Sequence, residues 1–284
     1  MNTELAIGGV PEHFNLPWLR LLESGALGGA GIRAAWSDFP GGSGVMSAAL
    51  AEGRLDVAML LCEAAVAAVA GGAPFRIVSL YTETPLLWGI HVPAGSRCAG
   101  VDDVRGARYA ISRPGSGSHL MAFALARARG WPTEELAFET VGGVDGAVEA
   151  LERGAADVFL WERFMTQPLV DAGLFRRIGE FAAPWPAFVV CASLSAIAEK
   201  RAALAAAVTS ALSAASELAA SPGAAAEISR RYGLRADEAA RWLAATRWAP
   251  RILPADAAAA AAFAMLRDVG VVAAGPAPVM TAAL

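Results

Sequence analysis

Two loops rich in glycine and serine, each just before a predicted helix, hold the residues best suited to bind an anion. Glycine lets the backbone approach a ligand, and the first N–H groups of a helix are unpaired donors at its positive end. Each loop alone is equally typical of an ordinary helix start. Arg113, beside the second loop, favours anion binding because a guanidinium pairs with carboxylate, sulfonate or phosphate. The candidate anion ligands are Gly42, Ser43 and Gly44 in the first loop, and Arg113, Gly115, Ser116, Gly117 and Ser118 in the second.

Four glutamates follow predicted strands, at the edge of the sheet where ligands bind in open α/β folds. They are Glu12, Glu63, Glu83 and Glu162. A glutamate near a helix start is also a normal partner of the helix dipole, so none of them alone indicates a site. Together, and with Thr82 beside Glu83, they favour a ligand that has a cationic or amine part as well as an anionic part.

Aromatic and basic side chains complete the predicted ligand set. Trp161 and Trp185 could stack on a planar or apolar ligand, whereas Trp36 is more typical of a core position. His119 lies at a helix start, where it could donate a hydrogen bond, while His91 lies inside an apolar strand. We expect ligand contacts from His13, Phe14, Trp161, Trp185 and Arg163.

Several catalytic and cofactor chemistries lack their usual patterns. Neither glycine-rich loop has the lysine of a phosphate-binding P-loop or the spacing of a dinucleotide fingerprint. Ser116 and Ser118 lack the elbow that exposes a nucleophilic serine, and Cys62 has no assigned base. The three cysteines, Cys62, Cys98 and Cys191, are far apart, and the three histidines lack metal spacing. We expect no metal, no cofactor and no catalytic residue.

Short strand-like runs alternate with helical stretches, which predicts an α/β chain with mostly parallel sheets covered by helices. Two such series follow each other. After a last strand, Phe188–Ala192, the chain is expected to be helical from Leu194 to about Asp268. The other predicted strands are Leu5–Gly8, Ile32–Trp36, Asp56–Leu61, Arg76–Leu80, Leu87–Val92, Tyr109–Ser112, Leu136–Val141 and Asp157–Trp161, and a helix is predicted at Arg163–Ala172.

Two apolar runs, Leu86–Val92 and Pro186–Ala192, are the candidate connections between the two series. They predict that the second series is inserted in the first, so that two strands join two lobes. Lobe 1 would comprise residues 1–89 and 187–284, with the helical C-terminal tail, and lobe 2 would comprise residues 90–186. The predicted binding site lies between the lobes.

Composition limits the location and the partners of the chain. Of its 284 residues 56% are hydrophobic and the mean hydropathy is +0.44, but much of this is alanine. Glu63 and Arg267 interrupt the long apolar stretches, so we expect no membrane insertion. A net charge of −4 with scattered basic residues argues against a nucleic-acid partner. The N-terminal residues lack the pattern of a secretory signal, so the expected location is cytoplasmic, or periplasmic if a leader was removed.

Motifs at the predicted loops carry a family resemblance. The pattern AL-x-x-G-x-x-D-V-A at residues 49–58 and the segments around Trp161 and Trp185 are the most specific. They resemble the type II periplasmic-binding-protein superfamily, in the branch with aliphatic-sulfonate and nitrate binding proteins and thiamine-pyrimidine-precursor synthases. The resemblance implies two lobes with a two-strand hinge that close on a small ligand. The matching segments are Val10–Phe14, Gly44–Met46, Ala49–Ala58, Pro85–His91, Ser112–Ser118, Trp161–Thr166, Arg177–Glu180 and Pro184–Pro186.

The resemblance implies a solute-binding protein, like the substrate-binding component of an ABC transporter, which traps a small anionic or zwitterionic metabolite. An ABC permease would then be a partner. The alternative is an enzyme on the same fold, related to thiamine pyrimidine precursor synthesis, with Glu12, His13, Glu63 or His119 as acid or base. The chain lacks the cysteine-rich segment of those synthases, which argues against this activity. A regulatory effector domain is a third interpretation, although no DNA-binding segment accompanies the lobes.

Overall fold

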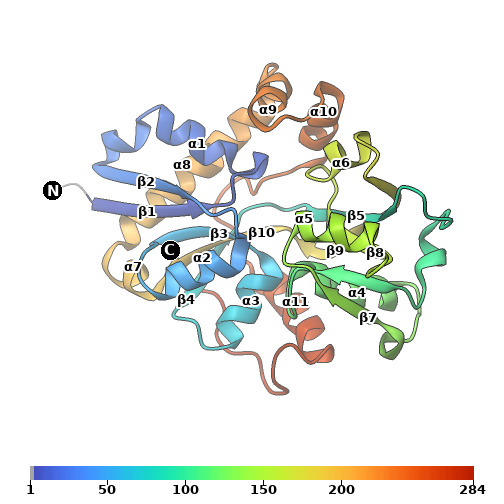
Figure 1. The fold of residues 1–284 in the computed structure, drawn as a ribbon. Helices are drawn as coiled ribbons and strands as arrows, with labels where there is room; N and C mark the ends of the chain where they lie inside the picture. Colours follow the sequence, from blue (N-terminus) through green and yellow to red (C-terminus); the bar gives the residue numbers. More distant parts are fainter. Residues whose placement is uncertain (1–2) are drawn as a thin grey trace. The chain divides into compact units, whose positions relative to one another are not determined.

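The computed structural model describes residues 3–284, which form two compact units (Figure 1). The described part of unit 1 runs to Thr84 and resumes at Trp185–Ala264 and Val272–Leu284. Unit 2 comprises Pro85–Pro184 and Met265–Val271. Strand β5 (Pro85–Pro93) begins where the chain enters unit 2, and strand β9 (Phe175–Pro186) ends around the point where it leaves.

Unit 1 is built on a sheet of five strands within the described residues, in the order β2-β1-β3-β10-β4. β1 pairs in parallel with β2 and β3, whereas β10 is antiparallel to β3 and β4, so β1 to β4 point the same way. Central β3 is apolar and almost wholly buried, as expected for a strand covered on both faces. The strands are β1 (Thr3–Gly9), β2 (Ile32–Asp38), β3 (Val57–Leu61), β4 (Phe75–Leu80) and β10 (Phe188–Ser193).

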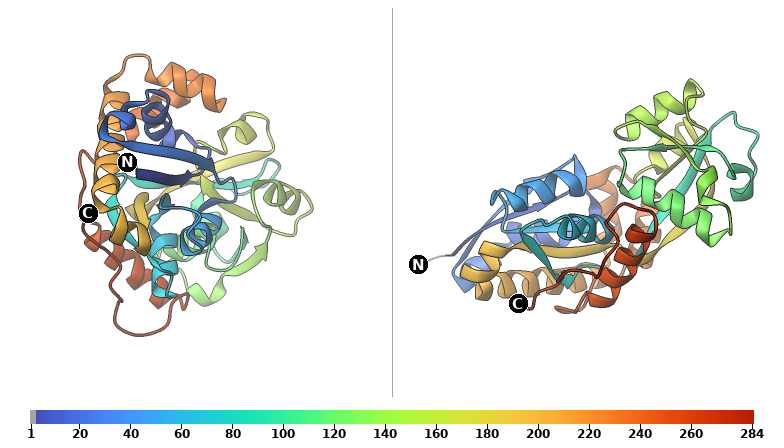
Figure 2. Two further views of the ribbon diagram at one scale, coloured as in Figure 1. Left: turned by 90° about the vertical axis from the view of Figure 1, so that its left-hand side faces the viewer. Right: turned by 90° about the horizontal axis from the view of Figure 1, so that it is seen from below.

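Helices cover both faces of the unit 1 sheet (Figures 1 and 2). α1 and α8 pack against each other over β1, and α2 and α3 pack over β3 and β10. Alanine, which favours helices, dominates several of these segments. The helices placed wholly in unit 1 are α1 (Leu16–Glu23), α2 (Gly42–Ala51), α3 (Cys62–Ala70), α7 (Leu194–Glu199), α8 (Arg201–Ala220), α9 (Ala224–Tyr232) and α10 (Ala236–Ala245), and α11 (Asp256–Asp268) begins there.

By length and composition alone, α8 could cross a membrane. Its buried residues recur every three or four positions, as in a helix that presents one side to a globular core. Leu204, Val208, Leu212 and Leu218 are among them, and α8 packs on α1 and β1. A buried helix of a globular unit passes the same test, so the apolar character of α8 is explained by packing.

Unit 2 has a second five-stranded sheet within the described residues, in the order β7-β6-β8-β5-β9. β6 is parallel to β7 and β8, and β5 is antiparallel to β8. The remaining strands are β6 (Arg108–Ile111), β7 (Ala137–Thr140) and β8 (Val158–Glu162). The helices are α4 (Gly117–Ala128), α5 (Val144–Glu152) and α6 (Gln167–Asp171).

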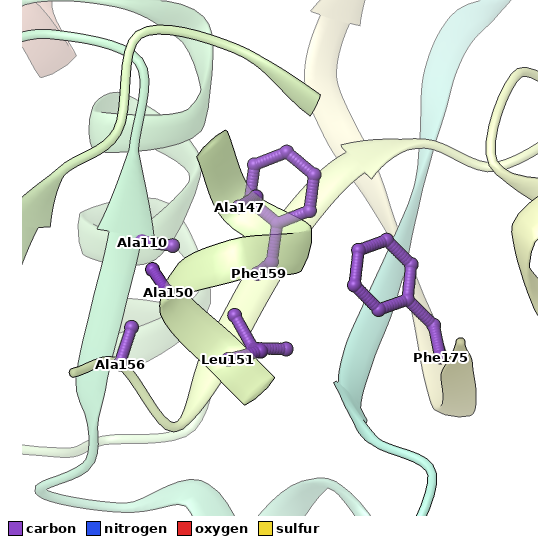
Figure 3. Close-up of a cluster of buried hydrophobic side chains, with 7 residues drawn as sticks. All are labelled: Ala110, Ala147, Ala150, Leu151, Ala156, Phe159 and Phe175. Carbon is purple, nitrogen blue, oxygen red and sulfur yellow. The ribbon is translucent and has the colours of Figure 1, made fainter. Parts of the chain in front are cut away.

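The core of unit 2 shows why α5 lies close to its sheet (Figure 3). Ala110 of β6 and Phe159 of β8 are in register, so both side chains leave the same face of the sheet. The small side chains of Ala147 and Ala150 let α5 approach this face. Neighbouring strand residues point to the opposite face, where α4 packs on β6 and β8.

Two elements differ from the expectations. β9 was not predicted, and the helix expected at Arg163–Ala172 is wrong in its first half, because residues 163–166 form a turn and α6 begins only at Gln167. The Glu162 carboxylate accepts a hydrogen bond from the Met165 backbone N–H and so stabilises the turn. Pro168 lies near the start of α6, where the backbone N–H groups have no partner within the helix, so the missing N–H of proline removes no helical hydrogen bond.

Candidate functional site

The loops after β1 to β4 lie at one edge of the unit 1 sheet, because these strands run in the same direction. β10 begins at this edge and ties the loops together. The Cys62 N–H donates to the Ala187 carbonyl, and the Phe188 carbonyl accepts the N–H groups of Tyr81 and Thr82. The edge holds these predicted residues: Glu12, His13, Phe14, Gly42, Ser43, Gly44, Glu63, Thr82, Glu83 and Trp185.

Phe14 is held firmly in the β1–α1 loop. Its carbonyl accepts hydrogen bonds from the Tyr81 hydroxyl at 2.8 Å and from Trp248 Nε1 at 3.2 Å. Its ring lies 4.8 Å, centroid to centroid, from the Phe188 ring. Phe14 is buried, so its ring is first of all a packing element of the edge. Trp248 lies far along the chain, and the sequence did not assign it to the site.

His13 is enclosed by aromatic rings rather than exposed to solvent. Its imidazole stacks on Trp242 of α10 at 4.2 Å between ring centroids, and the rings of Phe14 and Tyr232 lie nearby. Neither ring nitrogen has a hydrogen-bond partner among the described residues. Burial disfavours the charged form and lowers the pKa of His13 to about 3. His13 is therefore neutral at physiological pH.

Glu12 precedes this cluster and is half-buried. Its backbone has extended geometry just before the short 3-10 turn His13–Asn15. Desolvation by the surrounding protein raises the pKa of the Glu12 carboxyl to about 7. The Glu12 carboxyl is therefore about half protonated near neutral pH.

Glu63 and Trp185 are in direct contact. The indole Nε1 of Trp185 donates to Glu63 Oε2 at 2.8 Å, and both residues are buried. Glu63 lies in the first turn of α3, and Trp185 is near the end of β9. Two predicted residues that are far apart in sequence thus form one pair.

The other predicted residues of unit 1 have differing environments. The Ser43 hydroxyl accepts the Leu61 N–H at 3.0 Å, and the Thr82 hydroxyl accepts the Phe188 N–H at 3.0 Å, so both fasten neighbouring loops. Glu83 is exposed. Gly42, with φ +74°, starts α2 in the left-handed backbone region, and Gly44 is exposed in its first turn.

In unit 2 the predicted anion loop lies where β6 leads into α4. Ser116 is the N-cap of α4, and its hydroxyl accepts the His119 N–H. The Ser118 hydroxyl accepts the Ser112 N–H at 3.0 Å and lies 3.1 Å from the Ser116 hydroxyl. Gly115 has φ +76°, a conformation that favours glycine. The three serines thus hold the loop in one conformation, with the first turn of α4 behind it.

Arg113 and His119 flank this serine cluster. Arg113 is exposed, and within residues 3–284 its guanidinium hydrogen-bonds only to the neighbouring Pro114 carbonyl, at 3.4 Å. His119 Nδ1 accepts the Gly115 N–H at 3.1 Å, so this nitrogen is unprotonated in the observed contact. Burial also lowers the pKa of His119. His119 therefore supports the loop as a neutral acceptor.

The loop after β8 is held by charged groups of its own unit. Trp161 is partly exposed, with its ring stacked on Phe159 at 5.2 Å between centroids. Arg163 is buried, donates to Glu180 Oε1 at 2.6 Å and lies 4.3 Å over the Phe164 ring. Glu162, also buried, stabilises the following turn. These contacts give Glu162 and Arg163 a supporting role beside Trp161.

Because β8 is parallel to β6, the Trp161 loop and the Ser112–Ser118 loop lie at the same edge of the unit 2 sheet. Both loops were predicted from the sequence, but the residues that fix the unit 1 loops were not: Tyr81, Tyr232, Trp242 and Trp248.

No group of three or more metal-binding side chains occurs within residues 3–284. An open hollow of about 410 Å³ lies elsewhere, between α1 and α8, lined by Arg20, Ser24, Ser210, Ser213 and Glu217 among others.

The comparisons with known proteins agree with this architecture. The family model described as Ca3427-like PBP matches residues 88–181. The CA3427 gene product of Candida albicans, described as having the generic periplasmic binding protein fold, superposes with a TM-score of 0.86 at 24% identity, over 97% of this chain and 92% of that one. No curated protein matches the sequence.

Two sulfonate-binding proteins share the same fold. The alkanesulfonate-binding protein SsuA of Xanthomonas axonopodis pv. citri, bound to MOPS, has a TM-score of 0.80 at 18% identity, over 99% of both chains. The aliphatic sulphonate binding protein SsuA of Escherichia coli has a TM-score of 0.74 at 19% identity, over 96% of this chain and 89% of that one. The chain has the two-lobed fold of the type II periplasmic binding proteins, as the resemblance implied.

Proposed function

We propose that the protein is a solute-binding protein that closes its two lobes around a small anionic or zwitterionic metabolite. The fold supports this proposal, but one fold serves many functions, so the argument depends on the residues at the sheet edges. An ABC permease is the partner that the proposal implies, since neighbours of the same fold are sulfonate-binding proteins.

The observation that carries the proposal is the start of α4. Three serines fix the loop, and Gly115, in the left-handed backbone region, precedes the positive end of the helix, where an anion is favoured. The guanidinium of Arg113 is exposed beside this loop and forms no ion pair with a described residue. It is therefore free to bind a carboxylate, sulfonate or phosphate through two hydrogen bonds.

The candidate nucleophiles are placed for structure. Cys62 and Cys191 are buried, and burial raises the pKa of both thiols, which keeps them protonated and unreactive. The Ser116 and Ser118 hydroxyls contact each other, and no described histidine side chain accepts a proton from either. These contacts favour binding over nucleophilic catalysis.

One observation favours the enzyme alternative. Glu12 is half-buried at the sheet edge, and desolvation brings the pKa of its carboxyl to about 7, near the value that suits a general acid or base. Turnover of a bound metabolite, followed by mass spectrometry, would support this alternative, and a Glu12→Gln variant would then lose the turnover.

The proposal is tested by native mass spectrometry of freshly purified protein and by thermal unfolding with ethanesulfonate, propanoate and ethyl phosphate. We expect at least one of these anions to raise the unfolding temperature of the wild type. Arg113→Ala should lose this stabilisation, because the guanidinium no longer binds the anion. Arg97→Ala removes an exposed arginine on the β5–β6 connection and serves as the matched control. Equal stabilisation of wild type and Arg113→Ala would contradict the assignment.

A further inference from the structure

Glu63 is a buried carboxyl at the carboxyl edge of the unit 1 sheet. It lies in the first turn of α3, directly after β3, and only 2% of the residue is exposed. A carboxylate in such a place normally needs a cationic partner, because removing its charge from water costs several kcal/mol.

Among residues 3–284, Glu63 forms no ion pair, and its side-chain partner is the neutral indole N–H of Trp185 at 2.8 Å. Two partly buried acidic residues of unit 1, Asp56 and Glu227, are by contrast paired. Asp56 binds the ammonium of Lys200 with both oxygens at 2.9 Å, and Glu227 is paired with Arg20. Glu63 is thus a buried carboxyl without a positive partner among the described residues.

The electrostatics of Glu63 agree with this geometry. Burial raises the pKa of the Glu63 carboxyl, and the Trp185 hydrogen bond and the backbone at the helix start oppose this only in part. The free protein therefore keeps a proton on Glu63 to a higher pH than an exposed glutamate would. A cation placed beside the carboxyl would reverse the shift and release that proton.

Aromatic rings occur at the same edge of the sheet. The Trp185 indole donates to the Glu63 carboxyl. The Phe14 and Phe188 rings lie 4.8 Å apart between centroids, on neighbouring segments of the edge. The Cys62 N–H bond to Ala187 connects the start of α3 with the segment between Trp185 and Phe188. Ring faces attract cations, most strongly where water is excluded.

We propose that Glu63 receives a protonated nitrogen of the bound metabolite, an ammonium or amidinium group, with Trp185 as its wall. This inference rests on the proposed function and narrows the ligand class to zwitterions. The ligand nitrogen supplies the positive partner that residues 3–284 do not.

The test uses pairs of probes that differ only in the amine. They are 2-aminoethanesulfonate with ethanesulfonate, 3-aminopropanoate with propanoate, and 2-aminoethyl phosphate with ethyl phosphate. Binding to the whole protein is measured by calorimetry for the wild type, Glu63→Gln and Glu199→Gln. Glu199 is an exposed glutamate of unit 1 and provides the matched control.

In the wild type and Glu199→Gln we expect one amine-bearing probe to bind at least about tenfold more tightly than its amine-free analogue. The reason is that its amine forms a buried charge pair with the Glu63 carboxylate. In Glu63→Gln this preference should disappear, while the amine-free analogue binds as before. Equal binding of both members of every pair in the wild type would overturn the Glu63 assignment and leave the proposed function standing. Binding of no probe at all would count against both.

A second measurement needs only the wild type, in case Glu63→Gln does not fold. Calorimetry in two buffers of different ionisation enthalpy, without sulfonate or primary amine, reports the protons released on binding. The measurement is repeated at a series of pH values, and towards its acidic end, where Glu63 holds its proton, the amine-bearing probe should release more protons than its amine-free analogue. The same proton release from both probes at every pH would overturn the proposal.

Discussion

Glu12 and His13 are neighbours in the chain, and burial acts on both in the same way. Desolvation disfavours the charged form of each group, which raises the pKa of Glu12 to about 7 and lowers that of His13 to about 3. Between about pH 3 and 7 both side chains are therefore mostly uncharged, and they form no ion pair. Because the His13 nitrogens have no partner within residues 3–284, a proton added to this ring would be buried without compensation.

The contribution of His13 to the stability of the protein should fall as the pH falls from about 6.5 towards 3, while Glu12, whose pKa is raised to about 7, acts in the opposite direction between about pH 7 and 4.5. In this range the unfolded chain protonates His13 and the folded protein does not, so the unfolded state binds more protons and gains free energy. The pKa shift of His13 corresponds to a loss of at most roughly 4 to 5 kcal/mol in the free energy of unfolding. Urea unfolding at a series of pH values measures this slope.

The variant His13→Phe isolates the contribution of His13. It keeps an aromatic ring against Trp242 but removes the titrating nitrogens, so the free energy of unfolding of the variant should rise relative to that of the wild type as the pH falls from about 6.5 towards 3. His91, whose pKa burial lowers to about 4, keeps part of the dependence in both proteins. Parallel curves for wild type and variant would show that His13 does not cause the effect.

The residue scale also shows what the sequence could predict. Glu63 and Phe14 follow β-like runs, and the direction of parallel strands is enough to place them at one edge. The enclosure of His13 could not be predicted, because Trp242 comes from a helix more than two hundred residues away. Nothing in the local pattern near His13 indicates which later helix covers it.

At the scale of elements, strand β9 was missed for a physical reason. It carries Arg176, Arg177, Glu180, Pro184 and Pro186, and such charges and prolines are rare in central strands. β9 is an edge strand of its sheet, with β5 as its neighbour, so one of its sides need not donate to a partner. The α/β series, by contrast, follows from apolar runs such as β3, and it was predicted correctly.

The glycine near the start of α5 gives a prediction at the scale of elements. Replacing it with alanine should destabilise the protein, whereas the same change in most helices is stabilising. Alanine normally stabilises a helix relative to glycine by about 0.5 to 1 kcal/mol. At Gly146, a Cβ would overlap the carbonyl oxygen of Val141, which is backbone and unable to move alone. Gly146→Ala should therefore lower the free energy of unfolding by about 1 to 3 kcal/mol.

Chemical denaturation of Gly146→Ala and of a control variant measures this difference. Gly143→Ala is the control, since it lies at the N-cap of the same helix and its added Cβ would meet no atom within 4 Å. It should change stability far less. A Gly146→Ala protein as stable as the wild type would mean that the β7–α5 turn relaxes at little cost.

At the scale of the whole molecule, the chain enters unit 2, leaves it, and returns for Met265–Val271 before it ends in unit 1. The last segment lies along β4, at the edge of the unit 1 sheet. The Ile77 N–H donates to the Met280 carbonyl and the Ile77 carbonyl accepts the Ala282 N–H, both at 2.9 Å. A strand edge with unpaired backbone groups tends to pair with other chains, and this segment covers part of that edge.

Deleting residues 272–284 should therefore both destabilise the protein and promote self-association. The deletion exposes Ile77 and removes the buried Met280, so we expect the unfolding temperature to fall by several degrees and light scattering to rise with concentration. Val279→Ser is the control, because Val279 is 73% exposed and its side chain contributes little to packing. If the shortened chain unfolds at the wild-type temperature and scatters light as the wild type does, the C-terminal segment does not protect β4.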